Sequence, residues 1–193
     1  MQSRIEKFFR VRTGSSAPPP QPPQPPTPPT PSPTTASSTI DVYTDGACPS
    51  NGRGASVAGV GVAFPDHPDL NVSEALRDRP TNNRAELSAI LRALEVADER
   101  IDPARRRAVR VHTDSMLCVN TFTKWLAGWK RNGWRKADGA PVMNADLVRA
   151  VDERVRGRAR VEFVHVRAHT GRADRDSRFN ALADELAVAG AKK

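Results

Sequence analysis

Cysteines are scarce in this chain of 193 residues, and long apolar runs are missing. Cys48 and Cys118 give neither a disulfide framework nor the paired spacing of a zinc site, so we interpret both as reduced thiols of an intracellular protein. No apolar run approaches the roughly 20 residues that span a membrane. The N-terminus also lacks the apolar segment of a secretory signal. We therefore expect neither membrane attachment nor secretion.

Acidic residues are fewer than basic ones, which gives the chain a net charge of +8 and a pI of about 10.3. Residues 1–40 contribute +3 of this charge and residues 41–193 contribute +5. A basic folded domain predicts a polyanionic partner, with nucleic acid first among the candidates. A protein from a generally basic proteome would show the same excess, so the charge alone does not decide.

The first twelve residues, MQSRIEKFFRVR, predict a short amphipathic segment. Ile5, Phe8 and Phe9 stand at i, i+3 and i+4, so one helical turn places them on one side. The segment has no core in which to bury them, and exposed apolar patches usually meet a partner.

This segment resembles the PIP box of proteins that dock on the sliding clamp PCNA. The motif is a glutamine, two residues, an aliphatic residue, two residues and two aromatic residues, and it is matched by Gln2, Ile5, Phe8 and Phe9. The resemblance implies that Ile5 and the two rings fill an apolar pocket on the clamp while Gln2 hydrogen-bonds beside it. A mitochondrial presequence, which is also basic and amphipathic, and a chance match are the alternatives.

Residues 13–39 are dominated by proline, with glutamine, serine and threonine between the prolines. Proline provides no backbone donor, and the stretch offers almost nothing apolar to bury, so we predict a disordered, semi-rigid spacer of polyproline type. A role as an SH3-type ligand is the alternative. We expect the folded domain to begin at Ile40.

The remainder of the chain predicts a mixed α/β sheet. We expect strands within 41–45, 57–64, 70–76, 108–113 and 161–166, and helices over 81–101, 145–156 and 178–189, with two short helical pieces ending at Trp134. Strands in hairpins followed by alternating strands and helices indicate a sheet covered by helices on both faces. Gly59 and Gly61 mark a place where a neighbouring element approaches closely.

Four acidic residues lie where this arrangement would bring them together. Asp45 and Asp114 end two strands, Glu86 lies in the first turns of the long helix, and Asp184 lies on the last helix. The strand after the first crossover often lies beside the first strand, and sites form where such strand ends meet. Taken singly, each acid is equally well explained as a turn residue or a solvated surface group.

Converging carboxylates repel one another unless a cation holds them. Oxygen ligands favour Mg²⁺ or Mn²⁺ over zinc. Two such ions about 4 Å apart suit the in-line cleavage of a phosphodiester.

The residues around these acids resemble the motifs of type 1 ribonuclease H, the cellular enzyme. Asp45 in YTDG, Glu86 in TNNRAE, Asp114 in HTDS and Asp184 in NALAD match the four metal-binding acids of that family in order, and the match covers essentially all of 40–190. The resemblance implies a five-stranded mixed sheet of order 3-2-1-4-5 with helices on both faces, in a monomer. It also implies two Mg²⁺ ions, which Mn²⁺ can replace, and cleavage of the RNA strand of RNA–DNA hybrids into 3′-hydroxyl and 5′-phosphate ends.

The same resemblance assigns further residues. His169 matches a family histidine on a mobile loop, although residues 171–177 make this loop longer and more charged than is usual. Short polar side chains beside the acids would contact the 2′-hydroxyl, namely Ser50, Asn51, Asn82 and Asn83. Aromatic and basic side chains would contact the DNA strand, namely Trp125, Lys130, Arg131 and Trp134. A third set would bind one phosphate, namely Arg79, Thr81 and Asn144. Trp129 reads as a core residue, and Leu117 stands where the family often has an aromatic residue.

These interpretations divide the chain into a clamp-binding peptide (1–12), a linker (13–39) and a ribonuclease H catalytic domain (40–193). They place the protein at replicating DNA, removing RNA primers and R-loops in a nucleus or a viral replication compartment, with the mitochondrion as the alternative. A non-catalytic adaptor that only binds hybrids is the rival from another functional class. The loss of an acid would favour that rival, and no acid is lost. A ribonuclease H derived from a reverse transcriptase is the second rival.

Overall fold

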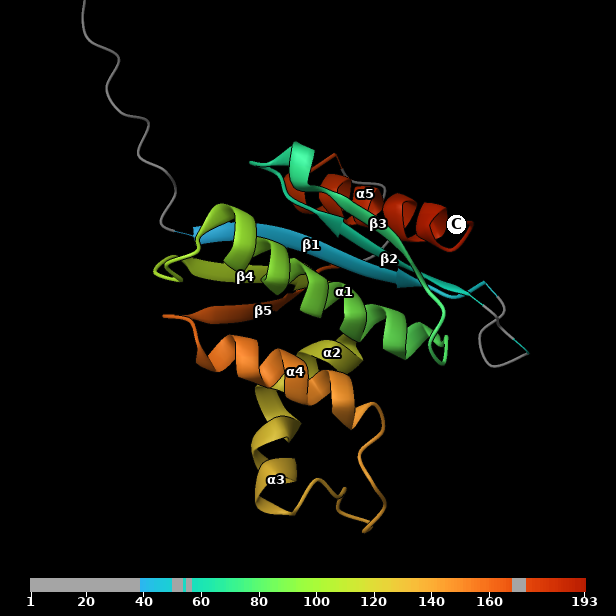
Figure 1. The fold of residues 1–193 in the computed structure, drawn as a ribbon, viewed down its shortest axis with the longest axis vertical. Helices are drawn as coiled ribbons and strands as arrows, with labels where there is room; N and C mark the ends of the chain where they lie inside the picture. Colours follow the sequence, from blue (N-terminus) through green and yellow to red (C-terminus); the bar gives the residue numbers. More distant parts are fainter. Residues whose placement is uncertain (1–38, 50–53, 55–56, 168–172) are drawn as a thin grey trace, which may run out of the picture. The chain divides into compact units, whose positions relative to one another are not determined.

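The computed structural model describes residues 39–49, 54, 57–167 and 173–193 (Figure 1). Several predicted residues lie outside these ranges, namely Gln2, Ile5, Phe8, Phe9, Ser50, Asn51 and His169. The peptide 1–12 and nearly all of the linker lie outside them too, so the predicted division into three parts stays a prediction.

Within the described ranges, five strands form one mixed sheet of order β3-β2-β1-β4-β5. The strands are β1 (Thr39–Ala47), β2 (Ala58–Ala63), β3 (Val72–Leu76), β4 (Ala108–Thr113) and β5 (Val161–His165). β2 pairs antiparallel with both β1 and β3, whereas β4 pairs parallel with both β1 and β5. The predicted sheet, its order and its mixed character are confirmed.

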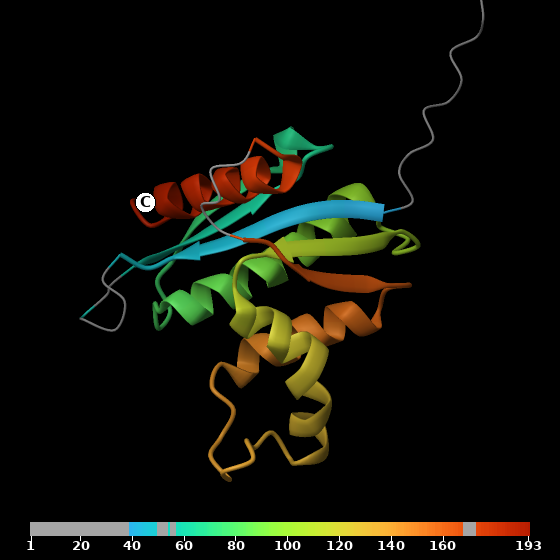
Figure 2. The same cartoon turned by 180° about the vertical axis from the view of Figure 1, so that it is seen from behind.

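Helices cover both faces of the sheet (Figures 1 and 2). The longer ones are α1 (Asn82–Val96), α4 (Ala145–Arg156) and α5 (Arg175–Gly190), and the shorter ones are η1 (Pro68–Leu70), η2 (Ala97–Ile101), α2 (Met116–Asn120), η3 (Thr121–Trp125) and α3 (Leu126–Arg131). α1 and α4 lie on one face and α5 lies on the other. Among the described residues, no helix has both the length and the apolar character that crossing a membrane requires.

Some helix boundaries differ from the prediction, and the short helical pieces end at Arg131 rather than at Trp134. α1 ends at Val96, and the residues up to Ile101 form the wider turn of a π-helix. α5 begins at Arg175 rather than at 178, because the Asp174 side chain accepts a hydrogen bond of 2.8 Å from the Ser177 backbone N–H and so caps the helix earlier. Part of the stretch predicted as a charged loop is therefore the first turn of α5.

The face under α1 is packed by apolar side chains. Val42 and Val62 from the strands and Leu87, Ile90 and Leu94 from α1 are buried completely or nearly so. The three helical positions are three or four residues apart, so they form one apolar stripe on α1. Burial of such side chains stabilises the fold by about 1.5–3 kcal/mol each.

The face under α5 is packed partly by apolar side chains such as Tyr43 and Phe179, and at β2 by backbone. A Cβ atom at Gly61 would lie 2.0 Å from the carbonyl oxygen of Ala183, and one at Gly59 would lie 1.8 Å from that of Ala187. Only glycine lets the helix lie this close to β2, so the predicted close approach is confirmed. It sets the depth at which the side chains of α5 reach the sheet.

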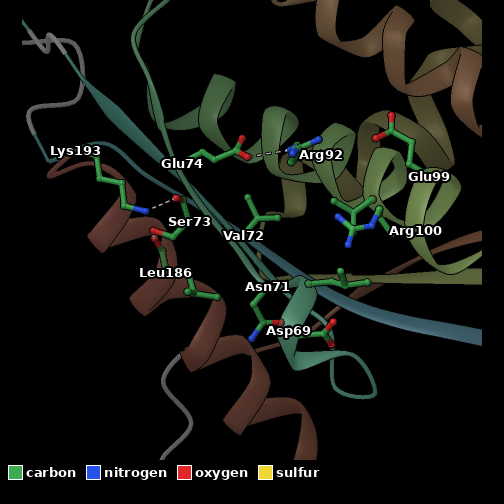
Figure 3. Close-up of a pocket in the computed structure, with 12 residues that line it drawn as sticks. Asp69, Asn71, Val72, Ser73, Glu74, Arg92, Glu99, Arg100, Leu186 and Lys193 are labelled. Atoms are coloured by element: carbon green, nitrogen blue, oxygen red, sulfur yellow. Dashed lines mark hydrogen bonds and ion pairs between the residues drawn. The ribbon is translucent and has the colours of Figure 1, made fainter.

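The edge strand β3 is covered in part by the end of the chain (Figure 3). The Lys193 Nζ donates a hydrogen bond of 2.6 Å to the Ser73 carbonyl, and the Arg92 side chain pairs with Glu74 at 3.1 Å. The residues that make these contacts line a pocket of about 440 Å³. None of the four predicted acids lines it, and charged side chains along an edge strand limit pairing with other chains.

We predict that Gly61→Ala destabilises the protein by about 1–3 kcal/mol, because the added methyl group must push α5 off β2. The free energy of unfolding, measured by urea titration, tests this prediction. Gly128→Ala is the matched control, since a Cβ there meets nothing within 4 Å in a helix, and we expect it to be neutral or slightly stabilising. Equal stability of Gly61→Ala and the parent protein would contradict the packing described above.

Candidate active site

Three carboxylates meet where β1, β4 and α1 come together. Within the described residues, one carboxylate oxygen from each of Asp45, Glu86 and Asp114 lies within 4.8 Å of the other two. β1 and β4 are adjacent and parallel, with Tyr43 opposite His112, so Asp45 and Asp114 follow at the same edge of the sheet. The structure thus brings together three of the four acids that the sequence singled out.

Glu86 reaches this edge because of the residue that follows Asp45. A Cβ atom at Gly46 would lie 2.3 Å from the Glu86 backbone nitrogen and 2.5 Å from the Ala85 carbonyl carbon. The start of α1 therefore rests directly on the β1 backbone. Thr81 caps α1 at that start, since its Oγ1 accepts a hydrogen bond of 3.3 Å from the Arg84 N–H.

The fourth acid approaches from the opposite face. Asp184 on α5 lies near Asp45, and its charge contributes to the raised pKa of Asp45. Asp184 contributes no atom to the group of three that lie within 4.8 Å. Helices on both sides of the sheet thus deliver one acid each to the ends of β1 and β4.

The electrostatics of the cluster are those of carboxylates that lack a counter-charge. Burial, followed by the charges of Asp45 and Asp114, raises the pKa of Glu86 from its ordinary value near 4.5 to about 9. Burial and the charge of Asp114 likewise raise the pKa of Asp45 to about 7. The Glu86 Oε2 is buried and has no hydrogen-bond partner among the described residues.

These observations fit a bound divalent cation. The donors that converge are all carboxylate oxygens, which hard cations such as Mg²⁺ and Mn²⁺ prefer. A cation would supply the charge that the cluster lacks and a partner for the orphaned oxygen of Glu86. The carboxylates of Asp45, Glu86 and Asp114 are therefore suited to hold a divalent metal ion.

An apolar pocket of about 180 Å³ opens between the start of α1, the helices α2 and α3, and the segment that precedes α4. Its walls include Asn83, Trp125 and Asn144, which were predicted to bind substrate. Trp129 also lines the pocket, although we had interpreted it as a core residue, and it packs against the core as well. Its spacing of four residues from Trp125 is the signal that could have identified it.

Arg84 is a residue whose importance the sequence analysis missed. Its buried guanidinium pairs with Asp146 at 3.0 Å and with Asp78 at 3.1 Å, and it donates to the Asn144 Oδ1 at 3.4 Å. It thereby holds the loop before α1 against the start of α4. An arginine in a first helical turn opposes the helix dipole, and this was the available signal.

The predicted phosphate-binding residues meet at this junction. Arg79 pairs with Asp146 at 2.9 Å, Thr81 caps α1, and Asn144 precedes α4 in a left-handed conformation with φ of 54°. The structure therefore places Arg79, Thr81 and Asn144 in one neighbourhood. Asn82 and Asn83 form the first turn of the same helix as Glu86.

Two of the predicted DNA contacts are engaged within the protein. The Lys130 Nζ lies 2.9 Å from the Asp152 carboxylate on α4, and the Arg149 guanidinium lies 4.1 Å from the centre of the Trp134 ring. These contacts attach the basic segment around α3 to α4, while Arg131 is exposed at the end of α3. Substrate binding by these residues stays a prediction.

The family model that matches this chain is described as RNase H, and it covers residues 37–192. The chain is 39% identical over 156 residues to Ribonuclease H1 of Rattus norvegicus, covering 80% of this chain and 51% of the relative. The chain therefore spans about half the length of that curated relative. It is also 39% identical over 151 residues to Ribonuclease H of Novosphingobium aromaticivorans, covering 78% of this chain and 97% of that protein.

A solved structure agrees with these relatives. The structure of LC11-RNase H1 in complex with RNA/DNA hybrid matches with a TM-score of 0.56 and 26% identity, and the match covers 79% of this chain and 96% of that one. Family model, curated relatives and fold coincide over the residues that carry the three convergent acids. The chain belongs to the ribonuclease H family.

Proposed function

We propose that this protein is an endoribonuclease that hydrolyses the RNA strand of RNA–DNA hybrids and leaves 3′-hydroxyl and 5′-phosphate ends. The observation that carries the proposal is the cluster of Asp45, Glu86 and Asp114, whose carboxylate oxygens lie within 4.8 Å of one another in a chain of net charge +8. The related LC11-RNase H1 was solved with an RNA/DNA hybrid, which supports this substrate.

In this proposal Asp45, Glu86, Asp114 and Asp184 hold two Mg²⁺ ions, which Mn²⁺ can replace. Bound ions of this kind supply an activated water and stabilise the oxygen that leaves. The protein's own part is to hold the carboxylates in place at the ends of two strands and on two helices. Because their places are set by backbone contacts, the acids need no rearrangement when the scissile phosphate arrives.

The residues around the acids would recognise the RNA strand and the DNA strand of the hybrid. Asn82 and Asn83 start the helix that carries Glu86, so polar groups that can contact a 2′-hydroxyl lie beside the proposed reaction centre. Arg79 and Asn144 provide charge and an amide for a phosphate. Trp125, which is 40% exposed, offers an apolar wall for the other strand.

We predict that Asp45→Asn lowers the rate of cleavage of a labelled RNA–DNA hybrid in Mg²⁺ by more than about 100-fold, the upper loss typical of residues that only support a metal ligand. Asp69→Asn is the matched control, because Asp69 is an exposed acid beside the edge strand (Figure 3). A parent protein that binds the hybrid without cleaving it would favour the non-catalytic adaptor. An undiminished rate in Asp45→Asn would refute the assignment of this acid.

We also predict that the metal-free protein loses stability as the pH rises from about 5 to 9. Between these values folded Glu86 keeps a proton that the unfolded chain has released, so the free energy of unfolding falls with rising pH. In EDTA at pH 8, Glu86→Gln should melt at least about 4 °C above the parent protein, or roughly 1–2 kcal/mol for a domain of this size. The gap should close towards pH 5 and shrink when Mg²⁺ is added.

Thermal melts in EDTA at several pH values measure this effect. Glu99→Gln serves as the control, since Glu99 is an exposed acid at the other end of the α1 region. If the parent protein and Glu86→Gln show the same dependence of melting temperature on pH, burial and the neighbouring carboxylates do not raise the pKa of Glu86 as described.

We further propose that Gln2, Ile5, Phe8 and Phe9 dock the protein on the PCNA clamp, which would raise the enzyme's local concentration at replicating DNA. This proposal places the protein in the nucleus or in a viral replication compartment, where it would remove RNA primers and R-loops. The match of all four residues to the clamp-binding pattern supports it.

We predict that a fluorescent peptide of residues 1–14 binds PCNA saturably in an anisotropy titration. Combined Phe8→Ala and Phe9→Ala should weaken binding at least about 10-fold, because aromatic anchors usually carry most of the energy of an interface. Ser3→Ala, at a position that the pattern leaves open, should bind like the parent peptide. Absence of binding would contradict clamp docking. A mitochondrial targeting peptide or a chance match would then remain as the explanation of the motif.

A further inference from the structure

α5 directs a second polar side chain towards the carboxylate cluster. Asn180 lies four residues before Asp184, so both side chains project from the same face of the helix. The Asp184 charge acts on Asp45, and the Asn180 Nδ2 donates a hydrogen bond of 3.2 Å to the Asp114 Oδ2. Asn180 is only 4% exposed although it carries an amide.

The orientation of this amide follows from its partner. An ionised carboxylate only accepts hydrogen bonds, so the nitrogen of the amide must face Asp114 and its oxygen must face away. That oxygen, Oδ1, is buried and has no hydrogen-bond partner among the described residues. A buried acceptor without a donor costs about 1–3 kcal/mol, so the site calls for a donor there.

The acids around Asn180 do not provide this donor in their ionised form. Asp114 already receives the amide's N–H, and Asp184 lies one turn away on the same helix. A water molecule is the donor that an ionised carboxylate cluster attracts, above all when that cluster holds a hydrated cation.

We propose that Asn180 is a positioning residue of the carboxylate site. Its Nδ2 fixes the orientation of the Asp114 carboxylate towards a divalent cation, and its Oδ1 accepts a hydrogen bond from a water of that cation. The inference rests on the cation of the proposed function. Groups that orient a metal ligand in this way typically change metal affinity or activity 10- to 100-fold when they are replaced.

An amide is well suited to this place because it is neutral. It adds a donor to Asp114 and an acceptor for water without adding a fifth negative charge to acids that already raise one another's pKa. The competing explanation is that Asn180 only fastens α5 to the sheet. α5 has other attachments for that purpose, since it lies on Gly59 and Gly61 and its Leu186 carbonyl accepts from Ser73 at 2.8 Å.

The test measures binding of Mn²⁺ alone to the full chain, without any nucleic acid, by electron paramagnetic resonance of the free ion. We expect Asn180→Ala to weaken Mn²⁺ binding at least about 10-fold. Asn120→Ala is the matched control, because the Asn120 Oδ1 is also buried without a partner among the described residues, and Asn120 lies at the end of α2. We expect its Mn²⁺ affinity to stay within about twofold of that of the parent protein.

A second variant separates positioning from folding. Asn180→Leu keeps the volume of the side chain but removes both polar atoms, so it should lose Mn²⁺ affinity as Asn180→Ala does. In cleavage assays both variants should lower kcat and leave the KM for the hybrid unchanged, because the proposed hybrid contacts lie elsewhere. Unchanged Mn²⁺ affinity in a folded Asn180 variant overturns the proposal. A parent protein that binds Mn²⁺ but cleaves no hybrid refutes the proposed function and leaves the role of Asn180 standing.

Discussion

The direct contact between the end of β1 and the start of α1 is the constraint on which the site depends. Gly46 has no side chain, and the α1 backbone at Ala85 and Glu86 occupies the space where one would lie. A helix that packs on the sheet by apolar side chains would normally stand about 10 Å away from it. At Gly46 the α1 backbone lies directly against the β1 backbone, and Glu86 thereby comes close to the two strand-end acids.

The protein separates its charges in space. Negative charge is concentrated at Asp45, Glu86 and Asp114, where it contributes to raised pKa values, while the segment around α3 carries basic residues such as Lys130 and Arg131. Some of that positive charge is held by local acids, as in the pair of Lys130 with Asp152. A polyanion bound over such a surface meets cationic and aromatic groups on its flanks and a cation-seeking cluster at its centre.

The sequence was sufficient for the features that depend on local order along the chain. Asp45 and Asp114 could be placed at strand ends, Leu87 and Ile90 on a buried face, and Gly61 at a close approach, because each follows from a periodicity or a residue type. The partners of Arg84, Lys130 and Asn180 could not be foreseen. Each has a partner 22 or more positions away in the chain, and spacing along a sequence does not say which distant side chains the tertiary fold makes neighbours. The early start of α5 depends on a single cap, Asp174. An aspartate can cap a helix or lie in a loop, and the sequence around it does not distinguish the two.

The contrast between the two faces of the sheet bears on how this protein can change over evolutionary time. Under most of α1 the contact is made by interchangeable aliphatic side chains, and such layers accept many substitutions that preserve volume. At Gly46 under α1, and at Gly59 and Gly61 under α5, backbone lies against backbone and no larger residue fits. Sequence drift should therefore be fast at the aliphatic positions and slow at these three glycines, two of which lie beneath the helix that carries Asp184 and Asn180.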